Sequence, residues 1–117
     1  MRPARFNAYV AVSYGILFTV FSLPALAKTL CVNPSGSSGC YKKIQTAVNN
    51  ASAYDVIRVT AGEYKEDVTI GKPLSLLGSG SNSTIIDATG LAHGIFVDGF
   101  DHPGLNNVTI SRFTVRN

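Results

Sequence analysis

The chain has 117 residues with ten basic and seven acidic side chains and a formal net charge of +3, and this length is enough for one domain at most. Two of the basic residues, Arg2 and Arg5, belong to an N-terminal leader, and the rest of the chain carries eight basic against seven acidic side chains. No Lys/Arg cluster remains of the kind that marks a nucleic-acid-binding surface, so we expect no nucleic-acid partner.

Residues 1–27 have the pattern of a secretory signal peptide. A positively charged start is followed by the apolar residues 8–23 and by the small-residue triplet Ala25-Leu26-Ala27. The alternative is an uncleaved membrane anchor, but a membrane-spanning helix needs about 20 apolar residues. We therefore expect cleavage before Lys28, no stable membrane span afterwards, and a secreted, periplasmic or cell-surface location.

Residues 28–55 form an N-terminal segment that contains both cysteines. Cys31 and Cys40 are separated by "VNPSGSSG", a stretch rich in turn-forming residues. A pair of cysteines this close is easily bridged in an oxidising compartment. A metal pair is the alternative, but no second pair of ligands is near in the sequence. We expect a Cys31–Cys40 disulfide.

The same segment contains the one convincing helix pattern after the leader. Ile44, Ala47, Val48 and Ala51 fall at positions i, i+3, i+4 and i+7, which places them on one face of a short amphipathic helix. Such a helix can cover the apolar end of whatever structure follows it.

From residue 56 onward the apolar period changes to two, which is typical of strands. Seven short strands are predicted, with Gly- and Pro-rich turns between them, at residues 57–60, 68–70, 74–76, 84–86, 95–97, 108–110 and 113–115.

The strands recur at a distance of about 20 residues. Ile57, Leu76 and Ile95 are each 19 apart and Val115 follows 20 later, and residues 68–78 resemble 108–117 at twice that distance. A repeat of this length predicts a solenoid whose coils share one core. A β-sandwich is the rival, but it favours longer strands and hairpin turns. The expected core is Ile57, Val59, Val68, Ile70, Leu74, Leu76, Ile95, Val97, Val108, Ile110 and Val115.

From Cys31 to Asn117 the sequence resembles the N-terminal part of secreted right-handed parallel β-helix proteins of the pectin-lyase-like superfamily. The matching stretches are "IQTAVNNA", "VIRVTAGEYKEDVTIGKPLSLLG", "STIID" and "NVTISRFTVRN". The resemblance implies an all-β fold, a right-handed parallel β-helix of about three to four coils over residues 56–117, with a short N-terminal capping α-helix. The chain stops at Asn117, where another coil is expected, so we expect a C-terminally truncated product.

The resemblance assigns no catalytic residue. Pectinesterases use a pair of carboxylates with an arginine, and pectate lyases use calcium-binding acids with a basic residue, but no segment here matches either motif. Calcium would follow from the family analogy alone, and no other cofactor is implied. We expect an exported, non-catalytic module that associates with polysaccharide and with itself through an open C-terminal coil. The alternative is the N-terminal fragment of a pectin-active enzyme, a lyase, esterase or hydrolase, whose catalytic coils are missing.

Five residues near the end of the chain are ligand-binding candidates: Asp87, His93, Asp98, Asp101 and His102. Carboxylates and imidazoles bind metal ions or exchange protons. The alternative is a plain loop, because "DGFDHPG" has a turn composition and Asp hydrogen-bonds locally in turns. We assign no metal to this group.

Three further side chains have two interpretations each. Tyr64 is expected to pack at a corner of a coil, with stacking on a sugar as the alternative. Arg58 and Lys72 suit contact with an acidic polysaccharide, although outward-facing basic residues are also ordinary on a strand.

Overall fold

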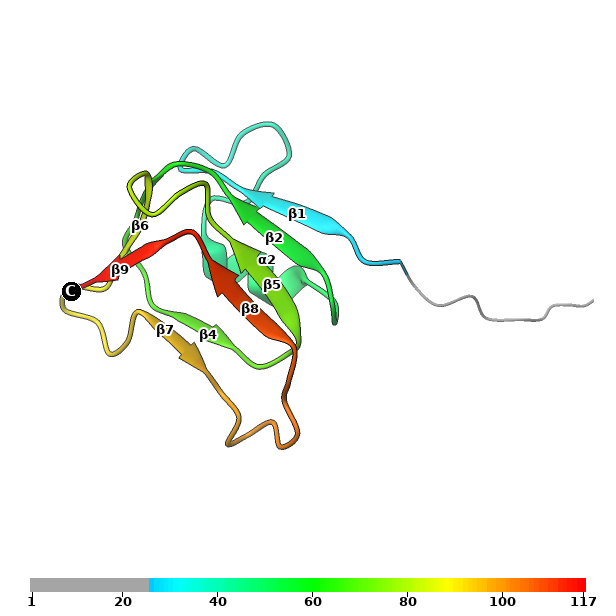
Figure 1. Cartoon of the computed structure of the whole chain (residues 1–117). Coiled ribbons are helices and arrows are strands. Elements are labelled where there is room, and N and C mark those ends of the chain that lie inside the picture. Colours follow the sequence, from blue (N-terminus) through cyan, green and yellow to red (C-terminus); the bar gives the residue numbers. More distant parts are fainter. Residues whose placement is uncertain (1–25) are drawn as a thin grey trace, which may run out of the picture.

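The computed structural model of the protein describes residues 26–117 (Figure 1). The predicted signal peptide lies almost wholly in residues 1–25, outside the described part. Residues 26–117 are mostly strands in parallel sheets, with one short helix. The elements are β1 (Thr29–Val32), α2 (Ile44–Asn50), β2 (Val56–Val59), β3 (Gly62–Tyr64), β4 (Val68–Ile70), β5 (Leu74–Leu77), β6 (Thr84–Asp87), β7 (Ile95–Val97), β8 (Val108–Ser111) and β9 (Thr114–Arg116).

The strands form three sheets in which every pairing is parallel. Their orders are β1-β2-β5-β8, β3-β6-β9 and β4-β7. From β2 onward the chain visits the three sheets in a constant order. β2, β3 and β4 lie in the first, second and third sheet, β5, β6 and β7 follow in the same order, and β8 and β9 return to the first and second. Helix α2 contacts β1, β2 and β4, and Figure 1 shows it behind the first sheet.

The register confirms one part of the predicted repeat and contradicts another. Leu76 pairs with Ile57, 19 residues earlier, as expected. However, Ile95 pairs with Val68 and lies in a different sheet, so the 19-residue spacing from Leu76 to Ile95 does not mark a pair of stacked residues. Val115, which follows Ile95 by 20 residues, belongs to the sheet of β3, β6 and β9.

The physical reason is that the connections differ in length. In the sheet of β1, β2, β5 and β8, Leu30 pairs with Ile57, Ile57 with Leu76, and Leu76 with Ile110, so successive partners are 27, 19 and 34 residues apart. Strands of all three sheets carry the same period-two pattern, and this pattern alone cannot tell them apart. The likeness between residues 68–78 and 108–117 is therefore not a structural equivalence.

Helix α2 forms where the apolar stripe predicted it and covers the inner strands. Ile44, Ala47 and Val48 are buried, against β1, β2 and β4. No side chain of the preceding residue caps the helix. Instead the Glu66 carboxylate accepts hydrogen bonds from the backbone N–H groups of Ile44, at 2.9 Å, and Gln45, at 3.0 Å. These are amides that a helix start leaves without internal partners.

The side chain of Gln45 also closes the free edge of β4. Its Oε1 accepts from the Thr69 N–H at 2.7 Å and its Nε2 donates to the Thr69 carbonyl at 3.2 Å. The side-chain amide thus takes the place of a neighbouring strand, and an edge so covered is not available to another chain.

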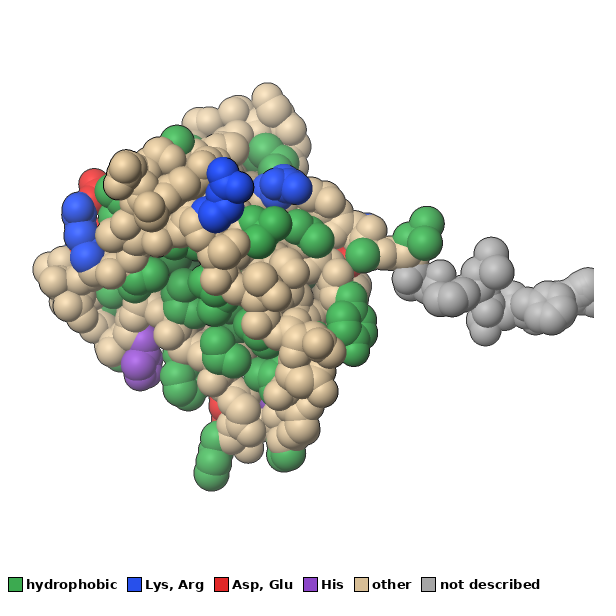
Figure 2. Space-filling view, viewed as in Figure 1, with side chains coloured by type: hydrophobic (Ala, Val, Ile, Leu, Met, Phe, Trp, Pro, Cys, Tyr) green, Lys and Arg blue, Asp and Glu red, His purple; other side chains and the backbone are tan. Residues whose placement is uncertain are grey.

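The core contains the six expected residues of the earlier strands, which are Ile57, Val59, Val68, Ile70, Leu74 and Leu76. Ile95 and Val108 are partly buried against it. The prediction is wrong for Val97, Ile110 and Val115, which are 42%, 37% and 46% exposed. They lie on β7, β8 and β9, the outermost strands of their sheets in the described chain, so no further strand covers them. Figure 2 shows apolar side chains gathered on this face.

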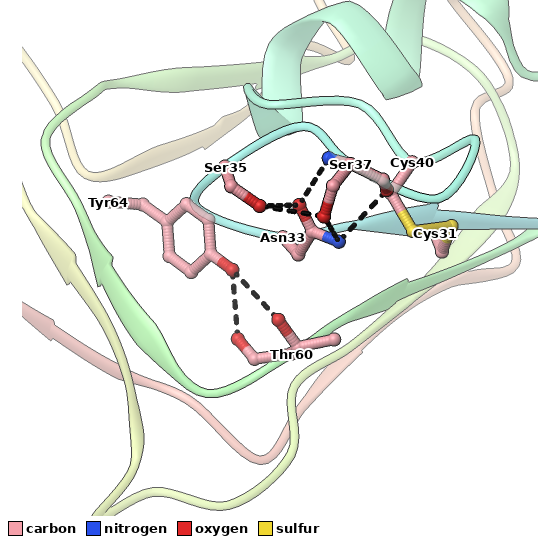
Figure 3. The surroundings of a disulfide bond; sticks show 7 residues. All are labelled: Cys31, Asn33, Ser35, Ser37, Cys40, Thr60 and Tyr64. Atoms are coloured by element: carbon pink, nitrogen blue, oxygen red, sulfur yellow. Dashed lines mark hydrogen bonds between the residues drawn. A yellow bond between two sulfur atoms is a disulfide. The ribbon is translucent and has the colours of Figure 1, made fainter.

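The predicted disulfide between Cys31 and Cys40 is present, with a Cα–Cα distance of 4.8 Å (Figure 3). The loop it closes is organised by Asn33, whose Oδ1 accepts from the Ser37 N–H and whose Nδ2 donates to the Ser37 carbonyl, both at 3.1 Å. Backbone hydrogen bonds join Tyr41, at the end of this loop, to Cys31 and Asn33, so the cross-linked loop that follows β1 returns to lie beside it.

Candidate functional site

A shallow groove of about 350 Å³ runs over the carboxyl ends of β2 and β5. Its lining consists of Arg58, Val59, Thr60, Leu77, Gly78, Ser79 and Arg112. Arg58 is exposed on the outer face of β2, where its register partner on β5 is Leu77. Figure 2 shows basic side chains close together over this part of the first sheet.

A close backbone contact brings Arg112 to the groove. A Cβ atom at Gly78 would lie only 2.1 Å from the carbonyl oxygen of Arg112, so the chain after β8 reaches this position only because residue 78 is glycine. Arg112 itself has a positive φ of 68°, and its Nη2 donates to the Ser79 carbonyl at 3.5 Å.

The floor of the groove is fixed by side-chain hydrogen bonds. The Ser79 hydroxyl donates to the Val59 carbonyl at 2.9 Å, and the Ser79 N–H donates to Oγ1 of the buried Thr84, also at 2.9 Å. These bonds tie β2, the turn after β5 and β6 together. A surface held in this way keeps its shape when a ligand binds, which lowers the entropic cost of binding.

The charge of the groove is entirely positive, because two guanidinium groups line it and no carboxylate does. Guanidinium groups hydrogen-bond carboxylates in a planar, two-point arrangement. The groove therefore suits a ligand with negatively charged groups, and its openness to solvent suits a polymer that lies across the surface.

A second, smaller groove of about 170 Å³ lies beside the start of α2 and has mixed charge. Lys42, Lys43 and Lys65 line it together with Glu63 and Glu66. The carboxylate of Glu66 is already occupied by the helix start, and the charges largely cancel, so this groove offers an anion much less than the first.

The five candidate residues near the end of the chain do not converge on one site. Asp87 lies on β6, where its Oδ1 accepts from the hydroxyl and the N–H of Thr89, at 2.6 and 3.0 Å. These two hydrogen bonds lower the pKa of Asp87. Arg116 on β9 reaches across the sheet to Asp87, at 3.6 Å, and to Glu63. An acid kept ionised in this way is a poor proton donor.

His93 and Asp98 are engaged elsewhere. The ring of His93 stacks on Phe96 at a centroid distance of 5.0 Å. Asp98 follows β7, and its Oδ1 accepts from the N–H groups of Phe100 and Asp101, both at 3.1 Å. Asp98 is thus a turn-forming residue, in agreement with the loop interpretation.

His102 is the one candidate whose side chain lies beside the side chain of another. Its Nδ1 is 3.7 Å from Oδ2 of Asp98 and 3.2 Å from the Asp98 carbonyl oxygen. The ring packs so closely on Gly71 that a Cβ atom there would lie 2.5 Å from Cε1. Asp101 is exposed in the same loop. Among residues 26–117, no group of three or more His, Cys, Asp or Glu side chains is arranged to hold a metal ion.

Tyr64 and Lys72 have structural partners. Tyr64 is only 3% exposed, and its hydroxyl donates to the Thr60 carbonyl at 2.9 Å (Figure 3). It packs inside the corner after β3, and burial raises its pKa. Lys72 donates through Nζ to the Ala51 carbonyl at 2.7 Å. Of the two basic residues singled out in the sequence, Arg58 alone lines the groove.

Arg112 is the groove residue that the sequence analysis missed. It lies between two predicted strands, in "SRF", and its neighbours are set by the close approach to Gly78 rather than by any local pattern. A glycine directly after a strand, as in "LSLLG", is the signal that marks such an approach.

Comparison of the chain with protein-family models, with curated proteins and with solved structures finds no match. In the part of the chain that the structure describes, no helix has the length and apolar character needed to cross a membrane.

Proposed function

We propose that residues 56–117 are coils of a right-handed parallel β-helix, capped at the N-terminal end by α2. The support comes from three parallel sheets visited in constant order and from register columns in which apolar residues stack, such as Ile57, Leu76 and Ile110. Parallel crossovers are right-handed in nearly all proteins, which is the reason for the handedness. This is also the architecture that the resemblance to the pectin-lyase-like superfamily implies.

We infer that the protein is exported and associates with an acidic polysaccharide through the groove between Arg58 and Arg112. The observation that carries this proposal is the pairing of two guanidinium groups, without an acid, along an open and rigid groove. Uronate-rich polymers present carboxylates at regular spacing, and several weak contacts along one polymer add up to useful avidity. The disulfide fits an oxidising compartment.

The alternative is that the chain is the front part of a pectin-active enzyme. The cluster of Glu63, Asp87 and Arg116 gives it some support, because it contains two carboxylates and an arginine. Its exposure and the ion pairs within it fit a structural charge cluster better. As it stands, we propose that the chain is a binding module without catalytic activity.

The test is binding of polygalacturonate to the exported protein by isothermal titration, with fully methyl-esterified polymer as the neutral reference. Arg58→Gln combined with Arg112→Gln should weaken binding about a hundredfold or more, because each of the two charged hydrogen bonds is worth about 1.5–3 kcal/mol. Lys42→Gln combined with Lys43→Gln removes the same charge from the other groove and should change binding little.

Equal weakening by the two double variants would show that only net charge matters, which contradicts a defined groove. Equal binding of the neutral polymer would contradict recognition of carboxylates. An assay for unsaturated or demethylated product from pectin addresses the alternative, since turnover lost on Asp87→Asn would favour the enzyme.

A further inference from the structure

Asp55 is a buried carboxylate at the point where three segments of the chain meet. It is 1% exposed and precedes β2. Its Oδ2 accepts from the Ser52 N–H at 2.8 Å, and its Oδ1 accepts from the backbone N–H of Lys28, also at 2.8 Å. Its own carbonyl accepts from the Ser75 N–H at the start of β5.

In the uncleaved chain, nearby cationic side chains compensate the charge of the Asp55 carboxylate only from a distance. Both direct hydrogen bonds come from neutral backbone amides, and these lower the pKa of Asp55. The cationic groups nearby are the side chains of Lys28 and Lys72, and the Lys72 ammonium is already bonded to the Ala51 carbonyl. An ionised acid with so little exposure is stabilised by a directly bonded cation.

The nitrogen that Asp55 binds is the one that signal-peptide cleavage would release. Leu26, Ala27 and Lys28 are all exposed, so the bond between Ala27 and Lys28 is accessible. Hydrolysis adds one water molecule, leaves a carboxylate on Ala27 and converts the Lys28 amide to an amine. That amine takes up a proton below its ordinary pKa of about 7.7–8.0.

We propose that Asp55 is the docking site of the mature N-terminus, so that cleavage after Ala27 converts a neutral hydrogen bond into an ion pair between the Lys28 α-ammonium and the Asp55 carboxylate. This inference rests on the export proposed above, but it is independent of the polysaccharide groove. The nitrogen stays in place, because the Lys28 carbonyl accepts from the Val56 N–H at 2.9 Å and β1 holds the next residues in register.

The ion pair has a defined pH dependence. Docking raises the pKa of the α-ammonium, so its stabilising effect is complete below the ordinary value and is lost as the pH rises through the raised value. Processing therefore makes the exported form more stable than the precursor at neutral pH, and the free end of the chain is held against β2.

The experiment compares two forms of the exported full chain, both checked by intact mass. One is processed to begin at Lys28. The other has a single glycine inserted after Ala27, so that cleavage leaves the ammonium one residue away while every other side chain is unchanged. Thermal unfolding is followed from pH 6 to pH 10, and the reactivity of the α-amine toward an acylating reagent is measured in the folded protein.

We expect the Lys28 form to unfold at higher temperature at pH 6–7, with the difference disappearing above the pKa of the amine, and its α-amine to react about tenfold more slowly. Asp55→Asn should remove both effects and the matched exposed variant Asp67→Asn should remove neither. Equal unfolding temperatures and equal reactivity of the two wild-type forms would overturn the proposal even if Asp55→Asn does not fold. Cleavage at another bond would also overturn it, without touching the proposed binding groove.

Discussion

Leu76→Ala tests whether the apolar columns of the first sheet form one continuous core. Leu76 is completely buried, with Ile57 on one side and Ile110 on the other in the register. The substitution removes three carbon atoms, worth about 0.8 kcal/mol each in lost burial, so about 2.4 kcal/mol in total. The cavity left behind adds to this, and buried leucines changed to alanine cost about 2–5 kcal/mol.

The position of Leu76 sets where in that range the result should fall. Its outer neighbour Ile110 is 37% exposed, so this side chain can move inward and partly fill the space. We therefore expect a loss of about 2.5–3.5 kcal/mol in the free energy of unfolding. For a domain of this size the unfolding temperature falls by about 4–8 °C per kcal/mol.

The assay is urea unfolding followed by circular dichroism, with Ser75→Ala as the matched control on the same strand. Ser75 contributes a backbone N–H to the structure and faces the opposite side of the sheet, so its change should be within about 0.5 kcal/mol of neutral. Leu76→Val, expected to cost about 1 kcal/mol, serves if the alanine variant does not fold. Similar losses for positions 75 and 76 would refute the assignment of inner and outer faces.

Three further outcomes follow from individual contacts. Thiol labelling of the unfolded, non-reduced protein should find no free thiol, and labelling of both cysteines would contradict the disulfide. Replacing both Cys31 and Cys40 by serine should lower the free energy of unfolding by about 2–3 kcal/mol. Glu66→Gln should cost about 0.5–2 kcal/mol by weakening the start of α2, whereas the exposed ion-pair partner Glu63→Gln should cost less than about 1 kcal/mol. The pKa of Asp87 is lowered in the folded state, so Asp87 stabilises the fold above its ordinary pKa and loses this effect as the pH falls. Asp87→Asn should therefore flatten the acid limb of the stability profile.

The local elements of this fold were readable from the sequence, but their partners were not. The stripe of Ile44, Ala47 and Val48 predicted α2, and period-two alternation predicted seven of the nine strands in the described chain. β3 was missed because "GEY" has a single apolar residue, and Tyr64 becomes a core residue only by pairing with Ile86. β1 was missed because it follows the leader directly and contains the first cysteine of the disulfide loop.

The sequence could not assign the strands to sheets for a related reason. Two strands pair according to the length and path of the connection between them, and a 19-residue spacing is correct for Leu76 but not for Ile95. The candidate site has the same limit. Arg58 was identified from its outward position on a strand, whereas Arg112 reaches the groove because Gly78 lets the two backbones meet, and contacts of this kind leave little trace in local sequence.

The two ends of the molecule differ, and this difference predicts how the chain associates. At one end α2 covers the inner strands and Gln45 closes the edge of β4. At the other, β7, β8 and β9 carry exposed apolar residues and unpaired edges, which template pairing with another chain.

A second copy is the partner we expect. Because the covered end blocks head-to-tail stacking, we expect two copies to meet open end to open end with their edge strands antiparallel, an arrangement whose symmetry closes at a dimer. Light scattering of the exported protein should give the mass of two chains at high concentration. Ile110→Lys should return it to a monomer, because the lysine would enter the shared apolar face. Thr109→Lys, one residue away on the outer face of β8, should leave the dimer intact. A wild-type monomer at high concentration would refute the association, and dissociation by both lysine variants alike would place the contact elsewhere on β8.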